Sequence, residues 1–441
     1  MQRTLMRELI KWKDNPSRKP LILKGARQVG KTWLLKEFGA REFPDVAYIR
    51  MEDNEAMRSL FEGSLNPQRL LEGMAAWLGK GLTRHTFIIL DEIQAVPRAL
   101  TALKYFNEDA PEYAIAAAGS LLGVALNPGI SFPVGKVNFL DLYPMSFTEF
   151  LLAEGAKNLC ELISGGDFSM IDVFAEQLTD KLKQYYYVGG MPEAVLEHST
   201  TKDIQRVRTI QNDILATYER DFGKHTSKET AERCREIWQS IPSQLAKENK
   251  KFIYGMAGDG RRGRDYKGAL QFLSDCGLVH LIPRVSKAGI PLEAYKSTSG
   301  FKLYITDVGL LGAMSGLDSA TLVEGAKLFQ EFKGAYTEQF VCQELVSTGG
   351  FKPYYWSAEN SSGEIDFLLQ EQGMIYPIEV KSATNVRSRS LSAFCKRYDL
   401  DTGVRLSLSR YRDEGWMRNV PLYAIGALRS VLLRRPSLHS S

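Results

Sequence analysis

PLILKGARQVGKTWLLKEFG, residues 20–39, contains a complete strand–loop–helix pattern. Its opening apolar residues, 21–23, predict a buried strand, and the apolar spacing after Thr32 predicts a helix. The loop between them, Gly25 to Thr32, reads G-x-x-x-x-G-K-[ST]. Loops of this kind turn backbone N–H groups toward a phosphate, and the following helix presents its positive end to the same group. The stretch therefore predicts a phosphate-binding loop in an α/β fold.

This loop and the start of its helix supply most of the predicted nucleotide contacts. Lys31 can reach the β- and γ-phosphates as a catalytic cation, and the Thr32 hydroxyl can ligate Mg²⁺. A chance glycine-rich turn is the alternative, but the strand and helix on either side argue against it. The predicted nucleotide-binding residues here are Gly25, Ala26, Arg27, Gln28, Val29, Gly30, Lys31, Thr32 and Trp33.

A second segment, HTFIILDEIQ (residues 85–94), ends a run of four apolar residues with two acids, Asp91 and Glu92. Such a run suits a strand buried in a parallel sheet, whose carboxyl end is where ligands bind in open α/β folds. We expect Asp91 to hold Mg²⁺ through water and Glu92 to orient or deprotonate the attacking water. A third strand, YAIAAAGS, ends at Ser120, which either senses the γ-phosphate or simply begins a loop.

Five motifs in order, GARQVGKT, LDEIQ, AAAGS, LYPMSFTEFL and YYYVGGMPEAV, make the chain resemble a family of prokaryotic AAA-type ATPases. That family is related to archaeal ATPases of the STAND group and has a C-terminal domain of poorly defined role. The resemblance implies ATP and Mg²⁺ as cofactors, with Asp91 and Glu92 as the acids of hydrolysis. It also implies that residues 190–192 resemble a Gly-x-Pro element that packs near the nucleotide base.

The middle of the chain is predominantly helical in its spacing. Residues 146–225 predict a helical lid, and residues 226–325 predict helices followed by a hairpin, the order of a winged-helix module. The resemblance implies the same module. Its basic segment GDGRRGRDYKG (residues 258–268) either contacts nucleic-acid phosphates or is a solvated loop of a structural module.

The C-terminal stretch GEIDFLLQEQGMIYPIEVKS (residues 363–382) predicts a hairpin that turns at Gln372-Gly373. Counting outward pairs Leu369 with Tyr376 and Phe367 with Ile378, all apolar and on one face. The same register places Asp366 opposite Glu379, where like charges would repel. A divalent cation, Lys381 or open solvent are the three candidates for offsetting that repulsion.

A helix before this hairpin carries Glu338 beside an apolar stripe. Glu338, Asp366 and the run Glu379-Val380-Lys381 together resemble the PD-(D/E)xK nuclease signature, with Ile-Asp in place of Pro-Asp. The resemblance implies that Glu338, Asp366 and Glu379 hold Mg²⁺ and that Lys381 stabilises charge. The alternative is a salt-bridged surface hairpin.

The sequence thus predicts an α/β P-loop NTPase of AAA type, with four parts. They are a P-loop ATPase core at 1–145, a helical lid at 146–225, a winged-helix module at 226–325 and a restriction-endonuclease-like α/β domain at 326–441. The function predicted is an ATP-hydrolysing switch coupled to a nuclease-like domain that binds or cleaves nucleic acid. The alternative is a non-cleaving regulatory or scaffold ATPase whose nuclease-like domain docks a protein partner.

Composition narrows these alternatives only slightly. A net charge of +4 over 441 residues permits a nucleic-acid partner without requiring one. The expected partners are nucleic acid, with DNA favoured over RNA, and either another protein or further copies of the same chain in a homo-oligomer. The dispersed cysteines and histidines argue against zinc, and no apolar run approaches membrane-spanning length. We therefore expect a cytoplasmic protein that does not enter a membrane.

Overall fold

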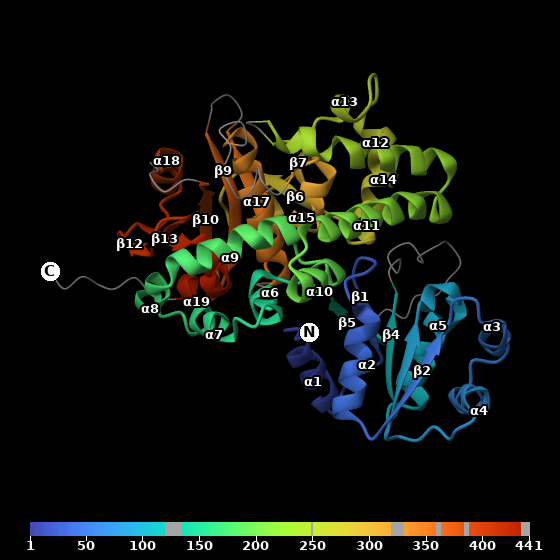
Figure 1. The fold of residues 1–441 in the computed structure, drawn as a ribbon. Helices are drawn as coiled ribbons and strands as arrows, with labels where there is room; N and C mark the ends of the chain where they lie inside the picture. Colours follow the sequence, from blue (N-terminus) through green and yellow to red (C-terminus); the bar gives the residue numbers. More distant parts are fainter. Residues whose placement is uncertain are drawn as a thin grey trace. The chain divides into compact units, whose positions relative to one another are not determined.

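The computed structural model describes residues 1–119, 135–247, 250–318, 330–348, 350–358, 363–382 and 388–433 (Figure 1). These residues group into two compact units. The N-terminal unit comprises Gln2–Tyr143 with Gln271–Leu278, and the C-terminal unit comprises Pro144–Leu270 with Val279–Ser441. Among the helices described, none has the length and apolarity needed to cross a bilayer.

The N-terminal unit alternates helices with short strands, as the sequence predicts. In chain order its elements are α1 (Met6–Asp14), β1 (Leu21–Lys24), α2 (Lys31–Glu42), β2 (Asp45–Arg50), α3 (Glu55–Glu62), α4 (Pro67–Leu78), β3 (Thr86–Asp91), η1 (Ile93–Ala95), α5 (Pro97–Asp109), β4 (Ala114–Ala118) and β5 (Asn138–Asp141).

The strands of this unit form one parallel sheet in the order β2-β3-β4-β1-β5. Residues of α3, α4 and α5 pack with Ile22, Ile88 and Leu90 in one apolar cluster. On the opposite face, Phe87 contacts Phe38 of α2 and Trp12 of α1. Because helices cover both faces, β3 and β4 are buried at every position, and the predicted parallel α/β sheet is confirmed.

The C-terminal unit begins with a run of helices and continues with strands and helices. In chain order the elements are α6 (Phe147–Ala153), α7 (Lys157–Gly165), α8 (Phe168–Val173), α9 (Ala175–Val188), α10 (Pro192–Thr201), α11 (Ile204–His225), α12 (Lys228–Leu245), α13 (Tyr254–Ala257), α14 (Gly263–Asp275), β6 (Val279–Val285), η2 (Leu292–Tyr295), β7 (Lys296–Ile305), α15 (Val308–Met314), α17 (Gln330–Ser347), β8 (Tyr354–Ser357), β9 (Glu364–Glu371), β10 (Met374–Val380), α18 (Arg389–Tyr398), β11 (Gly403–Ser407), β12 (Arg412–Asp413), β13 (Met417–Pro421), η4 (Leu422–Ala427) and α19 (Leu428–Leu433). The last residues of α14, from Gln271 onward, group with the N-terminal unit.

The strands of this unit form a single mixed sheet in the order β12-β13-β11-β10-β9-β8-β6-β7. The hairpin β6–β7, which the sequence predicts as part of the winged-helix module, joins this sheet because β6 pairs in parallel with β8. The predicted boundary between residues 325 and 326 therefore separates strands that belong to one continuous sheet. The division of the chain into four parts stays a prediction.

The hairpin β9–β10 has the register that the sequence predicts. Tyr376 pairs with Leu369 and Ile378 with Phe367. The turn residues Gln372 and Gly373 have φ of 48° and 76°, the left-handed conformation that a two-residue hairpin turn requires. The register is strongly specified because both strands bury their apolar face.

The motif LYPMSFTEFL contains the residues that cap the start of α6. Ser146 accepts a hydrogen bond from the amide of Glu149, and the Glu149 carboxylate accepts one from the amide of Ser146. This capping box satisfies two amides that the helix itself leaves unpaired. The adjoining amide of Phe147 donates to Glu344 of α17 at 2.8 Å, which ties the two helices together.

Candidate functional site

The loop Gly25–Gly30 joins β1 to α2, which is the strand–loop–helix order that the motif predicts. Gly25 has φ of 148°, and a Cβ atom there would lie 2.1 Å from the carbonyl oxygen of Leu142. No other residue fits that position without moving the backbone. Arg3 braces the loop from the N-terminal segment, since its guanidinium donates to the carbonyl oxygen of Val29 at 2.8 Å. Arg3 was not identified from the sequence, because nothing in its local pattern links it to the loop.

Lys31 begins α2 and is bonded to the loop itself. Its Nζ donates to the carbonyl oxygens of Gly25 at 2.9 Å and Ala26 at 2.7 Å. Burial lowers the pKa of Lys31 to about 8, although the carboxylates of Glu92 and Asp91 act in the opposite direction. A buried, partly desolvated ammonium of this kind binds an incoming phosphate more strongly than an exposed lysine would.

Asp91 ends β3 and meets Thr32 directly. Its Oδ2 accepts hydrogen bonds from the Thr32 hydroxyl at 2.8 Å and from the Tyr48 hydroxyl at 2.9 Å. The strands β1 and β3 are separated only by β4 in a parallel sheet, so their carboxyl ends lie at the same edge. A hydroxyl and a carboxylate side by side at this edge are the hard oxygen donors that hydrated Mg²⁺ takes in proteins. The predicted partners Thr32 and Asp91 are therefore brought together, and Tyr48 was missed.

Glu92 leaves the strand in a conformation that is uncommon for its type. Its φ of 51° and ψ of 46° place it in the left-handed region. The Gln94 side-chain amide donates to Glu92 Oε2 at 2.5 Å, so the carboxylate is held in position. Backbone conformations of this kind concentrate at functional sites, because the surrounding structure must maintain them.

Two further predicted contacts have different outcomes. Trp33 follows Thr32 on α2 and is 43% exposed. Ser120 lies outside the described residues, although β4, which precedes it, runs between the loop strand β1 and the acidic strand β3.

Two acids of the second predicted site, Glu338 and Asp366, lie close to a lysine. Lys302 of β7 has a fully buried side chain, and its Nζ lies 3.6 Å from Glu338 and 3.9 Å from Asp366. It also forms an ion pair with Glu364. Lys250 adds a second cation, 2.6 Å from Glu338. Neither lysine was identified from the sequence, because neither adjoins the hairpin in the chain.

These charges shift one another in opposite directions. Burial raises the pKa of Asp366, and the nearby Glu338 raises it further. Burial also acts to raise the pKa of Glu338, but Lys302 and Lys250 lower it below its usual range. The carboxylates Glu338 and Glu364 hold the pKa of Lys302 above the ordinary value despite its burial. The cluster is thus a buried ionic network whose lysine stays charged.

Glu379 lies on β10, Lys381 follows the end of that strand, and the two side chains form an ion pair. Lys381 Nζ is 3.0 Å from Glu379 Oε1, while Glu379 Oε2 is buried without a hydrogen-bond partner among the described residues. The Val380 amide donates to Asp366 Oδ2 at 2.8 Å. In the described ranges, no three histidine, cysteine or acidic side chains are grouped so as to hold a metal ion. The predicted Mg²⁺ ligands Glu338, Asp366 and Glu379 thus stay a prediction, while Lys302 and Lys381 supply the compensating charge that this structure shows.

Packing within the C-terminal unit explains why the Gly-Gly-Met-Pro element has a glycine at position 190. The Gly190 amide donates to Asp307 Oδ2 at 2.6 Å, and a Cβ at Gly190 would lie 2.0 Å from the Met145 carbonyl oxygen. Burial raises the pKa of Asp307 to about 6, although several hydrogen bonds act to lower it. Close backbone packing therefore explains Gly190, and its predicted place near a nucleotide base stays a prediction.

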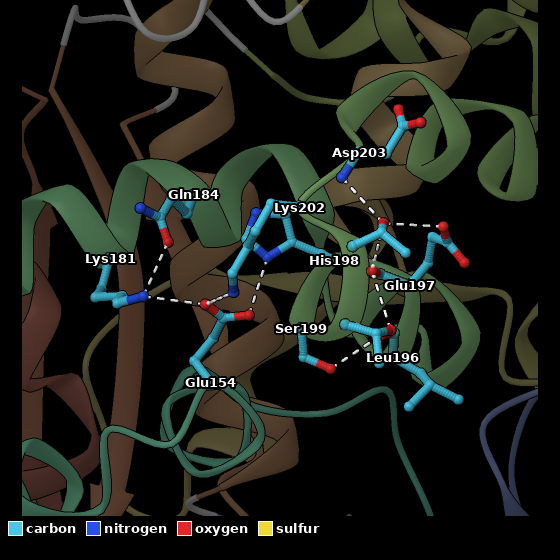
Figure 2. Close-up of polar contacts among 11 residues, drawn as sticks. Glu154, Lys181, Gln184, Leu196, Glu197, His198, Ser199, Lys202 and Asp203 are labelled. Carbon is cyan, nitrogen blue, oxygen red and sulfur yellow. Dashed lines mark hydrogen bonds and ion pairs between the residues drawn. The ribbon is translucent and has the colours of Figure 1, made fainter.

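A further ionic cluster is centred on Glu154, which follows α6 (Figure 2). Its carboxylate accepts hydrogen bonds from Lys181 of α9 at 3.0 Å and Lys202 at 2.6 Å, and it lies 3.0 Å from His198 of α10. Burial acts to raise the pKa of Glu154, but these three partners lower it to about 2. The side chain has no exposed surface, so the cluster joins three helical segments of the predicted lid from inside.

Three stretches of the chain match known families. Residues 17–151 match a family described as AAA domain. Residues 179–321 and 333–425 match two families that are each described as a domain of unknown function, DUF8612 and DUF4143. The first match contains the whole loop and both acids, Asp91 and Glu92, so residues 17–151 form an AAA-type ATPase domain. The curated proteins include no match to the chain.

Several solved structures are similar to this chain at low identity. The Walker-type ATPase PABY2304 of Pyrococcus abyssi is 14% identical, with a TM-score of 0.43, over 70% of this chain and 94% of that one. The Aeropyrum pernix ORC1 protein, solved in complex with DNA, is 15% identical, with a TM-score of 0.28, over 70% and 91%. AMPPCP-bound DnaA from Aquifex aeolicus is 16% identical, with a TM-score of 0.25, over 62% and 87%. TM-scores this low do not establish a shared arrangement of the whole chain.

Proposed function

We propose that the AAA-type domain binds ATP with Mg²⁺ and hydrolyses it, and that this cycle controls the C-terminal unit. The observation that carries the proposal is the 2.8 Å bond between Thr32 and Asp91, beside the loop that Lys31 closes. Thr32, and Asp91 through water, would hold the Mg²⁺ ion, which would neutralise phosphate charge when bound. Lys31 leaves its loop carbonyls to contact the β- and γ-phosphates.

Glu92 then acts on the water that attacks the γ-phosphorus. It accepts a proton from that water as the new P–O bond forms and the bond to the β–γ bridging oxygen breaks, which releases ADP and phosphate. The bond from Gln94 keeps the carboxylate oriented before the water arrives.

ATP turnover measured with Mg²⁺ and with EDTA tests this function. We expect turnover only with Mg²⁺, because Thr32 and Asp91 offer the ion its protein oxygens. Equal turnover in EDTA would contradict the assignment of both residues.

We further propose that the C-terminal unit binds nucleic acid without cleaving it. Support for binding comes from the order α12, α13, α14 and hairpin β6–β7, which is that of a winged-helix module, and from the nuclease-like order α17, β9, β10. Support for the absence of cleavage comes from Lys302, whose ammonium lies among Glu338, Glu364 and Asp366. A divalent ion at the same carboxylates would meet strong repulsion from that buried charge.

The intact protein is therefore expected to leave single- and double-stranded DNA and RNA uncut in Mg²⁺ or Mn²⁺. Gel analysis of labelled strands after long incubation measures this. Cleavage that disappears in the double variant Asp366→Ala, Lys381→Ala would overturn the non-cleaving proposal and establish a nuclease. Cleavage that persists in the double variant would indicate a contaminating enzyme.

A further inference from the structure

A large cavity lies within the C-terminal unit, and its lining residue Arg405 pairs with Glu379 of the second predicted site across β10 and β11. It has a volume of about 1280 Å³ and is lined by residues of α9, of α18 and of the strands β11–β13 with their connections. These elements, green and red in Figure 1, are far apart in the sequence but belong to one unit. Pockets for small ligands commonly hold about 300–1,000 Å³, so this cavity is large enough for an extended ligand.

The charged residues that line the cavity are predominantly basic. Its acidic members are Glu176, Asp180 and Glu414, and Asp180 is paired with the lining residue Lys183 at 3.0 Å. The six basic members are Lys183, Arg389, Lys396, Arg405, Arg410 and Arg412. A local excess of positive charge at a concave surface attracts anions and raises their local concentration.

One of these cations, Arg405, is fixed in place. It is only 8% exposed, and its Nε donates to Asn419 Oδ1 at 2.7 Å. Asn419 is held in turn by the Ser407 hydroxyl at 2.7 Å and by its own bonds to the carbonyl oxygens of residues 409 and 410. A guanidinium that is already immobilised loses little conformational entropy when it binds a phosphate.

The cavity also offers an aromatic surface and hydroxyl groups. Trp416 lines it and is 38% exposed, whereas most tryptophans of a folded domain are more deeply buried. Ser388 and Ser392, at the start of α18, line it as well. Phosphate-binding cations interleaved with a base-stacking aromatic ring are the usual composition of single-strand binding surfaces.

We propose that this cavity binds single-stranded nucleic acid, with backbone phosphates at Arg405, Lys396 and Arg412 and a base stacked on Trp416. This inference rests on the proposed nucleic-acid role of the C-terminal unit and gives that role a place and a strand preference. A duplex keeps its bases stacked inside and presents none to Trp416. The cavity therefore selects single strands over duplexes.

Fluorescence anisotropy of the full-length protein with labelled oligo-dT and with a duplex of equal length tests the proposal. The double variant Lys396→Glu, Arg412→Glu reverses two exposed lining charges and should weaken oligo-dT binding at least tenfold. Its salt dependence, the slope of log K against log salt, should become shallower by about 0.7 for each phosphate that the variant no longer neutralises. Trp416→Ala should weaken binding about tenfold with no change of slope.

Two charge reversals elsewhere serve as controls. Lys157→Glu changes an exposed lysine of α7 and should leave binding unchanged. The double variant Arg262→Glu, Arg264→Glu changes the basic segment at the start of α14, which is the rival phosphate-binding surface. Loss of oligo-dT binding in this second variant but not in the cavity variant would overturn the cavity while preserving a nucleic-acid role.

The remaining outcomes also decide the question. Failure of the wild-type protein to bind any nucleic acid would overturn both the cavity and the nucleic-acid role, while leaving ATP hydrolysis untouched. Displacement of oligo-dT by polyglutamate at equal charge concentration would overturn the nucleic-acid site and indicate a site for acidic partners in general. Equal affinity for the duplex would contradict the selection of single strands.

Discussion

Replacing Lys31 with alanine should reduce ATP turnover by about 10²- to 10³-fold, the usual effect of removing one preorganised charge from a reacting phosphate or oxyanion. In the structure the Lys31 ammonium donates hydrogen bonds to carbonyl oxygens of the loop. The variant should therefore bind the phosphates more weakly without disrupting a helix or strand of the core. Phosphate release under saturating ATP and Mg²⁺ is the measurement, and the melting temperature checks that the variant is folded.

The lowered pKa of Lys31 leads to a second prediction, which concerns the pH dependence of ATP binding. Because the pKa of Lys31 is lowered to about 8, the residue is mostly charged at pH 7 and loses its proton as pH rises. Binding of ATP should therefore weaken as pH rises through about 8 in the wild-type protein but not in Lys31→Ala. Lys11→Ala changes an exposed lysine paired with Glu8 and should leave turnover and its pH dependence unchanged. Undiminished phosphate release by Lys31→Ala would remove Lys31 from the site.

The second large effect is expected for Glu92→Gln. Glutamine keeps the shape of the side chain but cannot accept the proton of the attacking water, so turnover should fall by about 10²- to 10⁴-fold. Binding of ATP should be retained, because the phosphates are held by the loop amides, Lys31 and Thr32. The variant should therefore trap ATP, which nucleotide extracted from the purified complex would show.

A matched substitution separates this effect from a general loss of acidic charge. Glu55→Gln changes an exposed acid of α3 that is paired with Arg58, and it should leave turnover unchanged. Normal turnover by Glu92→Gln would assign the general base to another residue. Loss of ATP binding by the same variant would mean that Glu92 supports the pocket and does not act on water.

Local patterns predicted the parts of the molecule in which neighbours in the chain are neighbours in space. The loop from Gly25 to Thr32, the acidic end of β3 and the register of β9–β10 each depend on a single segment or on one tight turn. Strand alternation and turn residues carry enough information for these features. These local features alone do not imply ATP hydrolysis. The proposal of hydrolysis also requires Lys31 to bind the phosphates and Glu92 to accept a proton from the attacking water.

The features that the sequence did not predict depend on contacts between distant segments. Lys302 reaches Asp366 across 64 positions, and no pattern around either residue points to the other. Glu338 was placed beside an apolar stripe, yet α17 is so deeply enclosed that Glu338 and Glu344 are both buried. Sheet order decides these environments, because it brings β7, β8 and β9 into the same sheet. Tertiary packing thus places the ammonium of Lys302 beside Glu338 and Asp366, a contact that no local pattern predicts.

The most direct test is a crystal structure of Glu92→Gln grown with ATP and Mg²⁺, since this variant is expected to hold its nucleotide. We predict the triphosphate against the amides of residues 25–32, the Lys31 ammonium moved from its loop carbonyls onto the β- and γ-phosphates, and Mg²⁺ at Thr32 with Asp91 close by. An ordered nucleotide bound elsewhere on the protein, with the Thr32–Asp91 bond and the Lys31 contacts unchanged, would contradict this mechanism.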